Sequence, residues 1–153
     1  MKIACIIPSR YASTRLPGKP LRLIAGKTLV HRVYERAVQA KLPDVVIVAT
    51  DHEDIEKEVK SFGGHVMMTS ALHPTGTDRL AEVASHTPDY EIIVNVQGDE
   101  PLIDPDVIDR LAQDLIDHPE LDMATVATPL HEDEYDDPSS VKVVVNQKGE
   151  ALY

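Results

Sequence analysis

The sequence predicts an α/β fold of three layers, with helices on both faces of a mainly parallel central sheet. Two observations support this prediction. Short runs of β-branched and other apolar residues alternate with amphipathic helical stretches along the chain. In addition, the run at residues 44–50 is apolar enough to be buried on both faces, which is typical of a parallel strand covered by helices.

Six segments have the composition of strands. They lie at residues 2–7, 44–50, 65–68, 91–96, 123–127 and 141–145. The last of them is followed by Asn146-Gln147-Lys148-Gly149, which predicts a hairpin turn.

Stretches between these segments have helical periodicity. In the first, the apolar positions are Leu29, Val30, Val33, Ala37 and Val38. In the second, they are Ile55, Val59 and Phe62. We expect Asp51 to cap the second helix and Gly63-Gly64 to end it. A third helix is predicted to begin with Asp104 as its N-cap and Pro105 at its first helical position.

The composition is that of one globular domain in a reducing compartment. The chain has 153 residues, of which 42% are hydrophobic and 27% charged. Pro8 interrupts the apolar N-terminus too early for a signal peptide, and no apolar run approaches the roughly 20 residues of a membrane helix. The single cysteine, Cys5, lies in a predicted buried strand, so the cytoplasm is the expected location. A nucleophilic Cys5 is a weaker alternative, because a buried cysteine usually acts as a small hydrophobe.

Charge is distributed unevenly along the chain. The net charge of −11 argues against nucleic acid as a partner. Residues 1–34, however, contain seven basic residues and no acidic one, whereas the remainder holds eight basic and all 26 acidic residues. This asymmetry predicts that a small anionic ligand binds the N-terminal segment. The alternative is a chance fluctuation on a solvated surface.

The loop at residues 8–20 follows the first predicted strand, where ligands of open α/β sheets bind. It contains three cationic side chains, Arg10, Arg15 and Lys19, and hydroxyls that include Ser13. A triphosphate requires several positive charges together with N–H and O–H donors. The loop matches neither the P-loop nor the dinucleotide fingerprint. The alternative is a surface loop with incidental charges.

Two further segments carry side chains suited to ligand binding. In the segment 96–101, Asp99 follows a glycine at a strand end, where its carboxylate could hold Mg²⁺ or only cap the next turn. In the segment 73–80, Arg79 and two hydroxyls could contact a base or an anion. There the alternative is an ordinary helix cap at Thr75 or Thr77. The seven histidines show no metal-ligand spacing.

Several motifs in order along the chain give a resemblance to a known family. The first is Ile7-Pro8-Ser9-Arg10-Tyr11-Ala12-Ser13-Thr14-Arg15-Leu16-Pro17-Gly18-Lys19. The others are Ala49-Thr50-Asp51, Phe62-Gly63-Gly64, Gly76-Thr77-Asp78-Arg79-Leu80-Ala81-Glu82, Val94-Asn95-Val96-Gln97-Gly98-Asp99-Glu100-Pro101 and Ala151-Leu152-Tyr153. Together they resemble 3-deoxy-manno-octulosonate cytidylyltransferases (CMP-Kdo synthetases) over the whole chain. Thr75 stands where that family is expected to have a serine.

The resemblance implies a Rossmann-like nucleotidyltransferase fold of the nucleotide-diphospho-sugar transferase type. It also implies an enzyme that transfers CMP from CTP to the sugar acid Kdo, releasing pyrophosphate, for lipopolysaccharide synthesis. The residues expected around the nucleotide are Arg10, Ser13, Arg15, Lys19, Arg79 and Gln97. Of these, Arg79 and Gln97 are expected near cytosine and the sugar. Asp99 would hold Mg²⁺, and Lys19 and Asp99 would act in catalysis.

The family pattern also continues past Tyr153. Residues 1–153 are therefore expected to be the nucleotide-binding part of a single cytidylyltransferase domain that is truncated at its C-terminus. The full-length protein is expected to be a homodimer in the cytoplasm. No membrane or nucleic-acid partner is expected. Three alternatives stay open: a cytidylyltransferase for neuraminic acid or an amino analogue of Kdo, a non-catalytic domain that binds a phosphorylated ligand, and a signalling domain phosphorylated on Asp51.

Overall fold

The computed structural model describes residues 1–12 and 16–153, so Ser13 and Arg15 lie outside the described residues. The chain separates into two units, Met1–Met123 and Ala124–Tyr153. The first unit contains every strand and α-helix that the described residues form.

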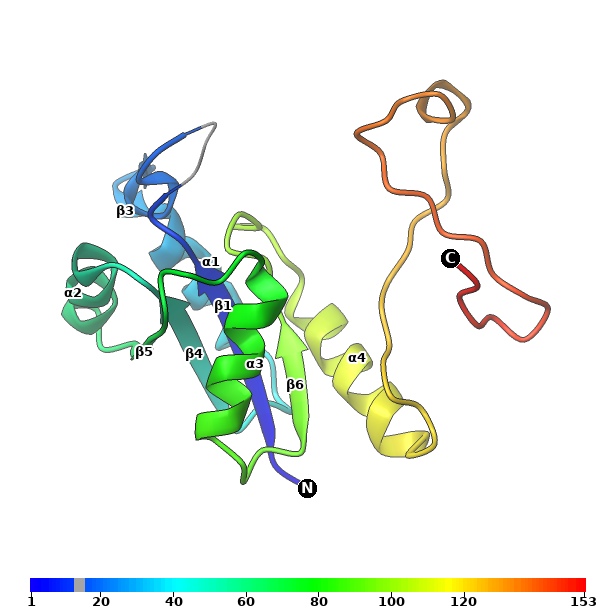
Figure 1. The fold of residues 1–153 in the computed structure, drawn as a ribbon, viewed down its shortest axis with the longest axis horizontal. Helices are drawn as coiled ribbons and strands as arrows, with labels where there is room; N and C mark the ends of the chain where they lie inside the picture. The colour runs from blue at the N-terminus through cyan, green and yellow to red at the C-terminus, as the bar shows by residue number, and fades with distance from the viewer. Residues whose placement is uncertain (13–15) are drawn as a thin grey trace. The chain divides into compact units, whose positions relative to one another are not determined.

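A four-stranded parallel sheet forms the centre of the first unit (Figure 1). Its strands are β1 (Ile3–Ser9), β4 (Val45–Thr50), β5 (His65–Met68) and β6 (Ile92–Asn95). Their order across the sheet is β5-β4-β1-β6, and every pairing is parallel. These four strands confirm the first four predicted from the sequence.

Four α-helices pack on the two faces of this sheet. They are α1 (Leu29–Ala37), α2 (Glu53–Ser61), α3 (Gly76–His86) and α4 (Pro105–Asp117). Alternate residues of β1 point to opposite faces: Cys5 joins the core formed with α1, α2 and α4, whereas Ile6 joins the smaller core formed with α3. The predicted three-layer α/β fold is therefore confirmed.

The helix ends confirm one expected cap and correct another. Asp104 caps α4 by accepting a hydrogen bond from the Asp106 amide at 3.1 Å, and Pro105 is the first helical residue. The expected cap at Asp51 is wrong, since α2 is capped by His52, whose Nδ1 accepts from the Asp54 amide at 3.2 Å. The Asp51 carboxylate has other partners, as described below. Helix α2 ends before Gly63, which has a φ of +77°.

The segment between β1 and α1 forms a short 3-10 helix, η1 (Lys19–Leu21), and a small hairpin of β2 (Leu23–Ile24) and β3 (Lys27–Thr28). Residue Pro20 of η1 is buried, so the turn is anchored in the unit although Lys19 is partly exposed. This anchoring fixes the backbone position of Lys19.

The second unit corrects two predictions. The described residues of Ala124–Tyr153 form one 3-10 helix, η2 (Glu132–Glu134), and one isolated β-bridge between Val145 and Ala151. The strands predicted at 123–127 and 141–145 are therefore wrong. Strand-like composition is insufficient here because these segments have no ladder of strand partners, and a lone two-stranded hairpin is marginal in water. The turn predicted at 146–149 is confirmed by a 3.0 Å bond from the Gly149 amide to the Asn146 carbonyl.

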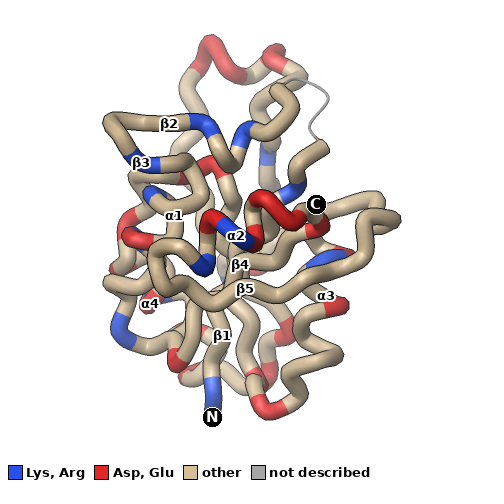
Figure 2. Tube along the Cα trace, turned by 90° about the vertical axis from the view of Figure 1, so that its left-hand side faces the viewer, with Lys and Arg blue, Asp and Glu red and all other residues tan. Residues whose placement is uncertain are grey.

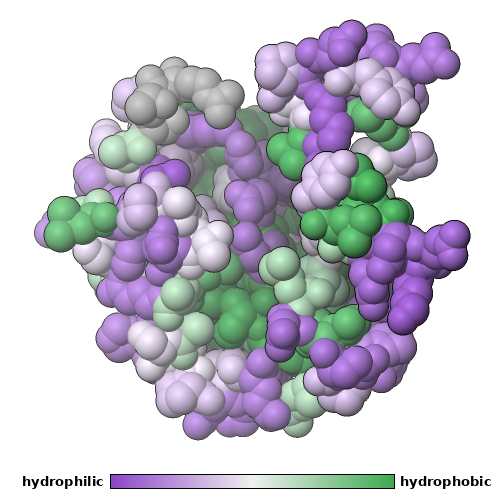
Figure 3. Space-filling view, turned by 45° about the vertical axis from the view of Figure 1, so that its right-hand side comes forward, coloured by the Kyte–Doolittle hydropathy of each residue, from purple (hydrophilic) through white to green (hydrophobic). Residues whose placement is uncertain are grey.

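Several apolar side chains of this second unit are exposed. They are Val126, Val141, Val143, Val144, Val145, Leu152 and Tyr153. Figure 3 shows that apolar side chains lie among polar ones on the molecular surface.

Candidate functional site

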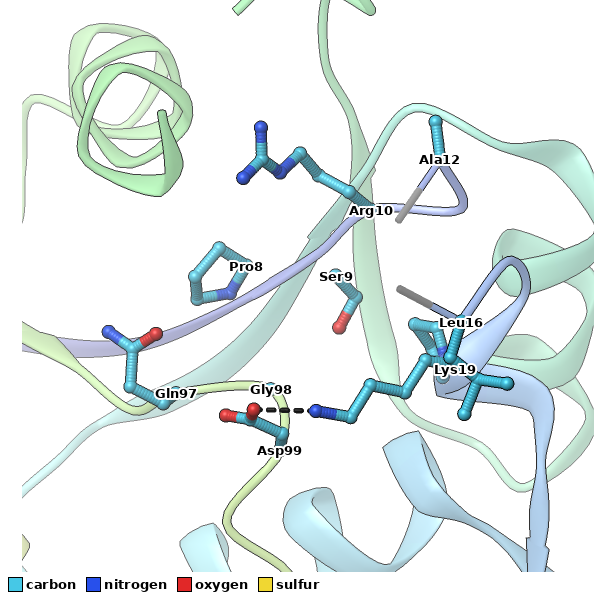
Figure 4. Close-up of a pocket in the computed structure, with 10 residues that line it drawn as sticks. Pro8, Ser9, Arg10, Ala12, Leu16, Lys19, Gln97, Gly98 and Asp99 are labelled. Atoms are coloured by element: carbon cyan, nitrogen blue, oxygen red, sulfur yellow. Dashed lines mark hydrogen bonds and ion pairs between the residues drawn. The ribbon is translucent and has the colours of Figure 1, made fainter. Parts of the chain in front are cut away.

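An open pocket of about 550 Å³ lies where β1 and β6 end. The two strands run parallel to each other, so their carboxyl ends lie at the same edge of the sheet. This is the edge at which α/β proteins bind ligands. The pocket is lined by Pro8, Ser9, Arg10, Ala12, Leu16, Lys19, Pro20, Gln97, Gly98 and Asp99 (Figure 4). These residues come from two of the three segments that the sequence singled out.

An ion pair crosses the pocket between Lys19 and Asp99. The Lys19 ammonium donates to Oδ2 of Asp99 at 2.6 Å, although the residues are 80 positions apart. Both side chains remain well exposed, at 39% and 53%. They are therefore accessible to a ligand. A phosphate could replace Asp99 as the partner of Lys19, and a cation could replace Lys19 as the partner of Asp99. Among the described residues no backbone N–H donates to this carboxylate, so the alternative of Asp99 as a turn cap lacks support.

Gly98 brings the β6 loop into close contact with the end of β1. A Cβ added to this residue would lie 2.6 Å from the Pro8 carbonyl oxygen, which is closer than real Cβ atoms approach a backbone atom. Glycine is therefore required for this approach. The approach also brings Asp99 within reach of Lys19.

Arg10 and Gln97, which the sequence analysis assigns to nucleotide binding, also line the pocket. In Figure 4 the Arg10 guanidinium points away from the Lys19–Asp99 pair. Its Nη1 donates to the Pro74 carbonyl at 3.1 Å, which links the loop after β1 to the segment that precedes α3. Both side chains are exposed.

Arg79 does not lie where the sequence predicted. Its side chain is completely buried, and its Nη2 donates to Oδ2 of Asp51 at 2.8 Å. Its Nη1 donates to the hydroxyl of Thr69, and its Nε has no partner among the described residues. Residue 79 is the fourth of α3, where the helix turns this side chain toward the sheet rather than the pocket. Arg79 is a buried structural residue in this structure, so a direct contact with cytosine or the sugar lacks support.

The partner of Arg79, Asp51, was missed as a structural residue of the site. Its Oδ1 accepts from the backbone amide of Tyr11 at 3.3 Å. The Tyr11 ring stacks on His52 with centroids 3.8 Å apart, and the Tyr11 carbonyl accepts from the Gly18 amide at 3.0 Å. Through its hydrogen bond to Tyr11, Asp51 thus fixes the start of the predicted triphosphate loop, where that loop leaves β1. In the sequence, an aspartate directly after a predicted strand could have indicated this role. The same pattern, however, also predicts a helix cap.

The segment before α3 is fixed by its own hydrogen bonds. Thr75 caps the helix in a reciprocal capping box with Asp78. The hydrogen bond from the Thr75 hydroxyl is the main reason that the pKa of Asp78 is lowered. Nearby, the pKa of Glu82 is lowered by hydrogen bonds from the Ser70 amide and from His73. The alternative of a helix cap is therefore correct for Thr75.

Some basic residues of the N-terminal segment form ion pairs within the protein, whereas others line the pocket. Lys27 and Arg32 pair with Glu35, and the hydrogen bond from Lys27 lowers the pKa of the Glu35 carboxyl. Arg10 and Lys19 are the cations of this segment that line the pocket within the described residues. Figure 2 shows the Lys and Arg positions around β2 and β3. The positive charge available to a ligand is therefore smaller than the sequence count suggests.

Burial makes Cys5 a poor nucleophile. It raises the pKa of the Cys5 thiol to about 12, so the thiol stays protonated at neutral pH. Among residues 1–12 and 16–153, no cluster of three or more metal-ligating side chains occurs. In the same ranges, no helix is both long and apolar enough to cross a membrane.

The chain is similar to known proteins over its whole length. The family model described as cytidylyltransferase matches residues 4–153. The 3-deoxy-manno-octulosonate cytidylyltransferases of Syntrophotalea carbinolica and Geobacter metallireducens are 54% and 53% identical to the chain over its whole length. The chain spans 61% and 60% of those two relatives.

Solved structures give the same result. A structure of CMP:2-keto-3-deoxy-manno-octonic acid synthetase in complex with CTP matches the whole chain and 63% of its own, with a TM-score of 0.91 and 44% identity. A cytidylyltransferase from Leptospira borgpetersenii matches 76% of the chain and 49% of its own, with a TM-score of 0.67 and 31% identity. On the match over residues 4–153, the chain belongs to the cytidylyltransferase family.

Proposed function

We propose that the protein to which this chain belongs transfers CMP from CTP to Kdo, giving CMP-Kdo and pyrophosphate. The observation that carries the proposal is the pocket at the ends of β1 and β6, where Lys19 and Asp99 face each other at 2.6 Å. The names of the relatives and the CTP complex of a similar structure support the choice of both substrates.

The triphosphate of CTP is assigned to the cationic residues that line the pocket. Lys19 and Arg10 supply positive charge, and charge-assisted hydrogen bonds to phosphate are stronger than neutral ones. Ser13 and Arg15, which lie outside the described residues, are proposed as further phosphate contacts. Gln97 also lines the pocket with an exposed side chain, and it is proposed to contact cytosine or the sugar.

Asp99 is proposed to hold Mg²⁺. Mg²⁺ keeps several water ligands and commonly takes one or two carboxylates together with substrate phosphates, so one exposed carboxylate facing a phosphate site fits it. Bound there, the ion would neutralise charge on the phosphate oxygens. Lys19 would then leave Asp99 and pair with the phosphates.

The reaction itself requires little covalent help from the protein. The anomeric hydroxyl oxygen of Kdo forms a bond to the α-phosphorus of CTP, the bond from that phosphorus to the bridging oxygen breaks, and the hydroxyl proton passes to solvent water. The oxygen of the departing pyrophosphate takes up the bonding electrons. Holding both reactants in this geometry can supply about 7–11 kcal/mol of the barrier. The residues of the pocket are proposed to act mainly by positioning and charge stabilisation.

The biological setting is proposed from the same family resemblance. CMP-Kdo serves lipopolysaccharide synthesis, and we place the enzyme in the cytoplasm, as a homodimer at full length. The free, buried thiol of Cys5 is consistent with a reducing compartment.

Substitution of Lys19 tests the proposed triphosphate site. In the protein of full family length, Lys19→Ala is expected to weaken CTP use by tenfold to a hundredfold, because a charge-assisted phosphate contact contributes roughly 1.5–3 kcal/mol. Steady-state pyrophosphate release at varied CTP measures this loss. The matched control is Lys57→Ala, an exposed lysine on α2 that lies outside the pocket. Unchanged kinetics in Lys19→Ala would remove the lysine from the site.

A further inference from the structure

The hydroxyl of Ser9 is a buried polar group without a partner. Ser9 is the last residue of β1 and is only 2% exposed. Its Oγ makes no hydrogen bond with the described residues. Buried polar groups are nearly always hydrogen-bonded, because leaving one unpaired costs free energy. An exception of this kind requires an explanation.

The position of this hydroxyl suggests one. Ser9 lines the pocket, and in Figure 4 its oxygen points toward the side where Lys19 and Asp99 meet. The loop after β6 confines it there, since a Cβ added to Gly98 would lie 3.3 Å from this oxygen. The hydroxyl is therefore held next to Gly98, at the wall of the pocket that Lys19 also lines.

The surrounding groups define the chemistry of a partner. Lys19 and Arg10, which also line the pocket, are cations that only donate hydrogen bonds. A ligand atom that these cations attract carries negative charge and accepts hydrogen bonds, and a serine hydroxyl can donate one to it. Phosphate oxygens of a nucleotide satisfy both conditions, whereas the uncharged base and ribose satisfy only one.

We propose that the Ser9 hydroxyl donates a hydrogen bond to a phosphate oxygen of the bound nucleotide. This assignment deepens the proposed function and rests on it. Ser9 is then a binding residue that stays unpaired in the free protein and gains its partner only from the ligand. Its side chain sets part of the affinity for the phosphate chain at the expense of stability in the free protein.

This role predicts opposite effects of Ser9→Ala on stability and on binding. Removing an unpaired hydroxyl should leave the thermal midpoint of the free protein unchanged or raise it. The same change should weaken binding of CTP and of inorganic tripolyphosphate by about twofold to tenfold, the range for one lost hydrogen bond. Binding of cytidine, which has no phosphate, should not change.

The experiment is a set of titrations of the chain with these three probes in the presence of Mg²⁺. Calorimetry follows CTP and tripolyphosphate, and NMR chemical shifts follow cytidine. Ser61→Ala is the matched control, because the Ser61 hydroxyl is exposed and donates to the Glu58 carbonyl at 2.7 Å, away from the pocket. It should bind all three probes like the unaltered chain.

Three results would overturn the assignment. They are equal affinity for CTP in the Ser9→Ala variant, an equal loss for cytidine, or a clear fall in the thermal midpoint, which would make the hydroxyl a structural group. Each of these leaves CTP binding by the unaltered chain intact, so the proposed function would survive. Absence of CTP binding in the unaltered chain would instead reject the proposed function, and the Ser9 assignment with it.

Discussion

Replacing Arg79 by methionine is expected to lower the free energy of unfolding by about 3–5 kcal/mol, because removing one partner of a buried ion pair leaves the other charge unpaired. The Arg79 side chain is fully buried, and Asp51, its partner, is 10% exposed. Native domains are stable by only about 5–15 kcal/mol, so the loss is a large part of the total. Urea unfolding monitored by circular dichroism measures it.

Two companion variants make this prediction specific to the pair. Arg110→Met removes an exposed arginine from α4 and should change stability by no more than about 0.5 kcal/mol. The double variant Asp51→Asn/Arg79→Met should recover part of the loss, because no buried carboxylate is left without its counter-charge. If Arg79→Met were as stable as Arg110→Met, the buried ion pair would have no structural importance.

Asp99→Asn should lower Mg²⁺-dependent turnover of the full-length protein by more than about a hundredfold, since a bound metal contributes several kcal/mol of charge stabilisation in phosphoryl chemistry. The substitution keeps the shape of the side chain and removes its charge. It also removes the ion pair with Lys19, but that pair is well exposed and its loss should hardly affect folding. Pyrophosphate release at saturating CTP and varied Mg²⁺ is the measurement.

Asp104→Asn is the matched control for this variant. Asp104 caps α4, and asparagine caps a helix about as well as aspartate, so this second variant should retain its activity. Turnover in Asp99→Asn equal to that in Asp104→Asn would exclude Asp99 as the metal ligand.

Much of the fold could be predicted from the sequence because the central sheet is buried on both faces. Apolar runs such as those of β1 and β4 are long, and the helices between them have clear periodicity. The two strands predicted after residue 122 were wrong because composition does not reveal whether a segment has a partner strand. Val141 is 96% exposed in the structure, which shows how little burial its β-branched side chain obtains.

The site was predicted in part for a similar reason. Lys19 and Asp99 follow strand ends, and the parallel sheet brings those ends together. Arg79 and Asp51 are likewise a cation and a carboxylate, but their side chains are buried and pair inside the protein. Such an orientation depends on how α3 packs on the sheet, which no local pattern encodes. The unpaired hydroxyl of Ser9 could only be recognised once its surroundings were known.

If the protein acts as proposed, the CTP triphosphate must bind in the pocket that Lys19 and Asp99 line. Calorimetric titration of residues 1–153 with CTP and Mg²⁺, beside the same titration of the Lys19→Ala variant, measures that binding without the sugar. We expect weak but saturable binding with a stoichiometry of about one, competition by inorganic tripolyphosphate, and at least tenfold weaker binding by the variant. Absence of binding, or equal affinity of the chain and the variant, would show that this pocket does not hold the triphosphate.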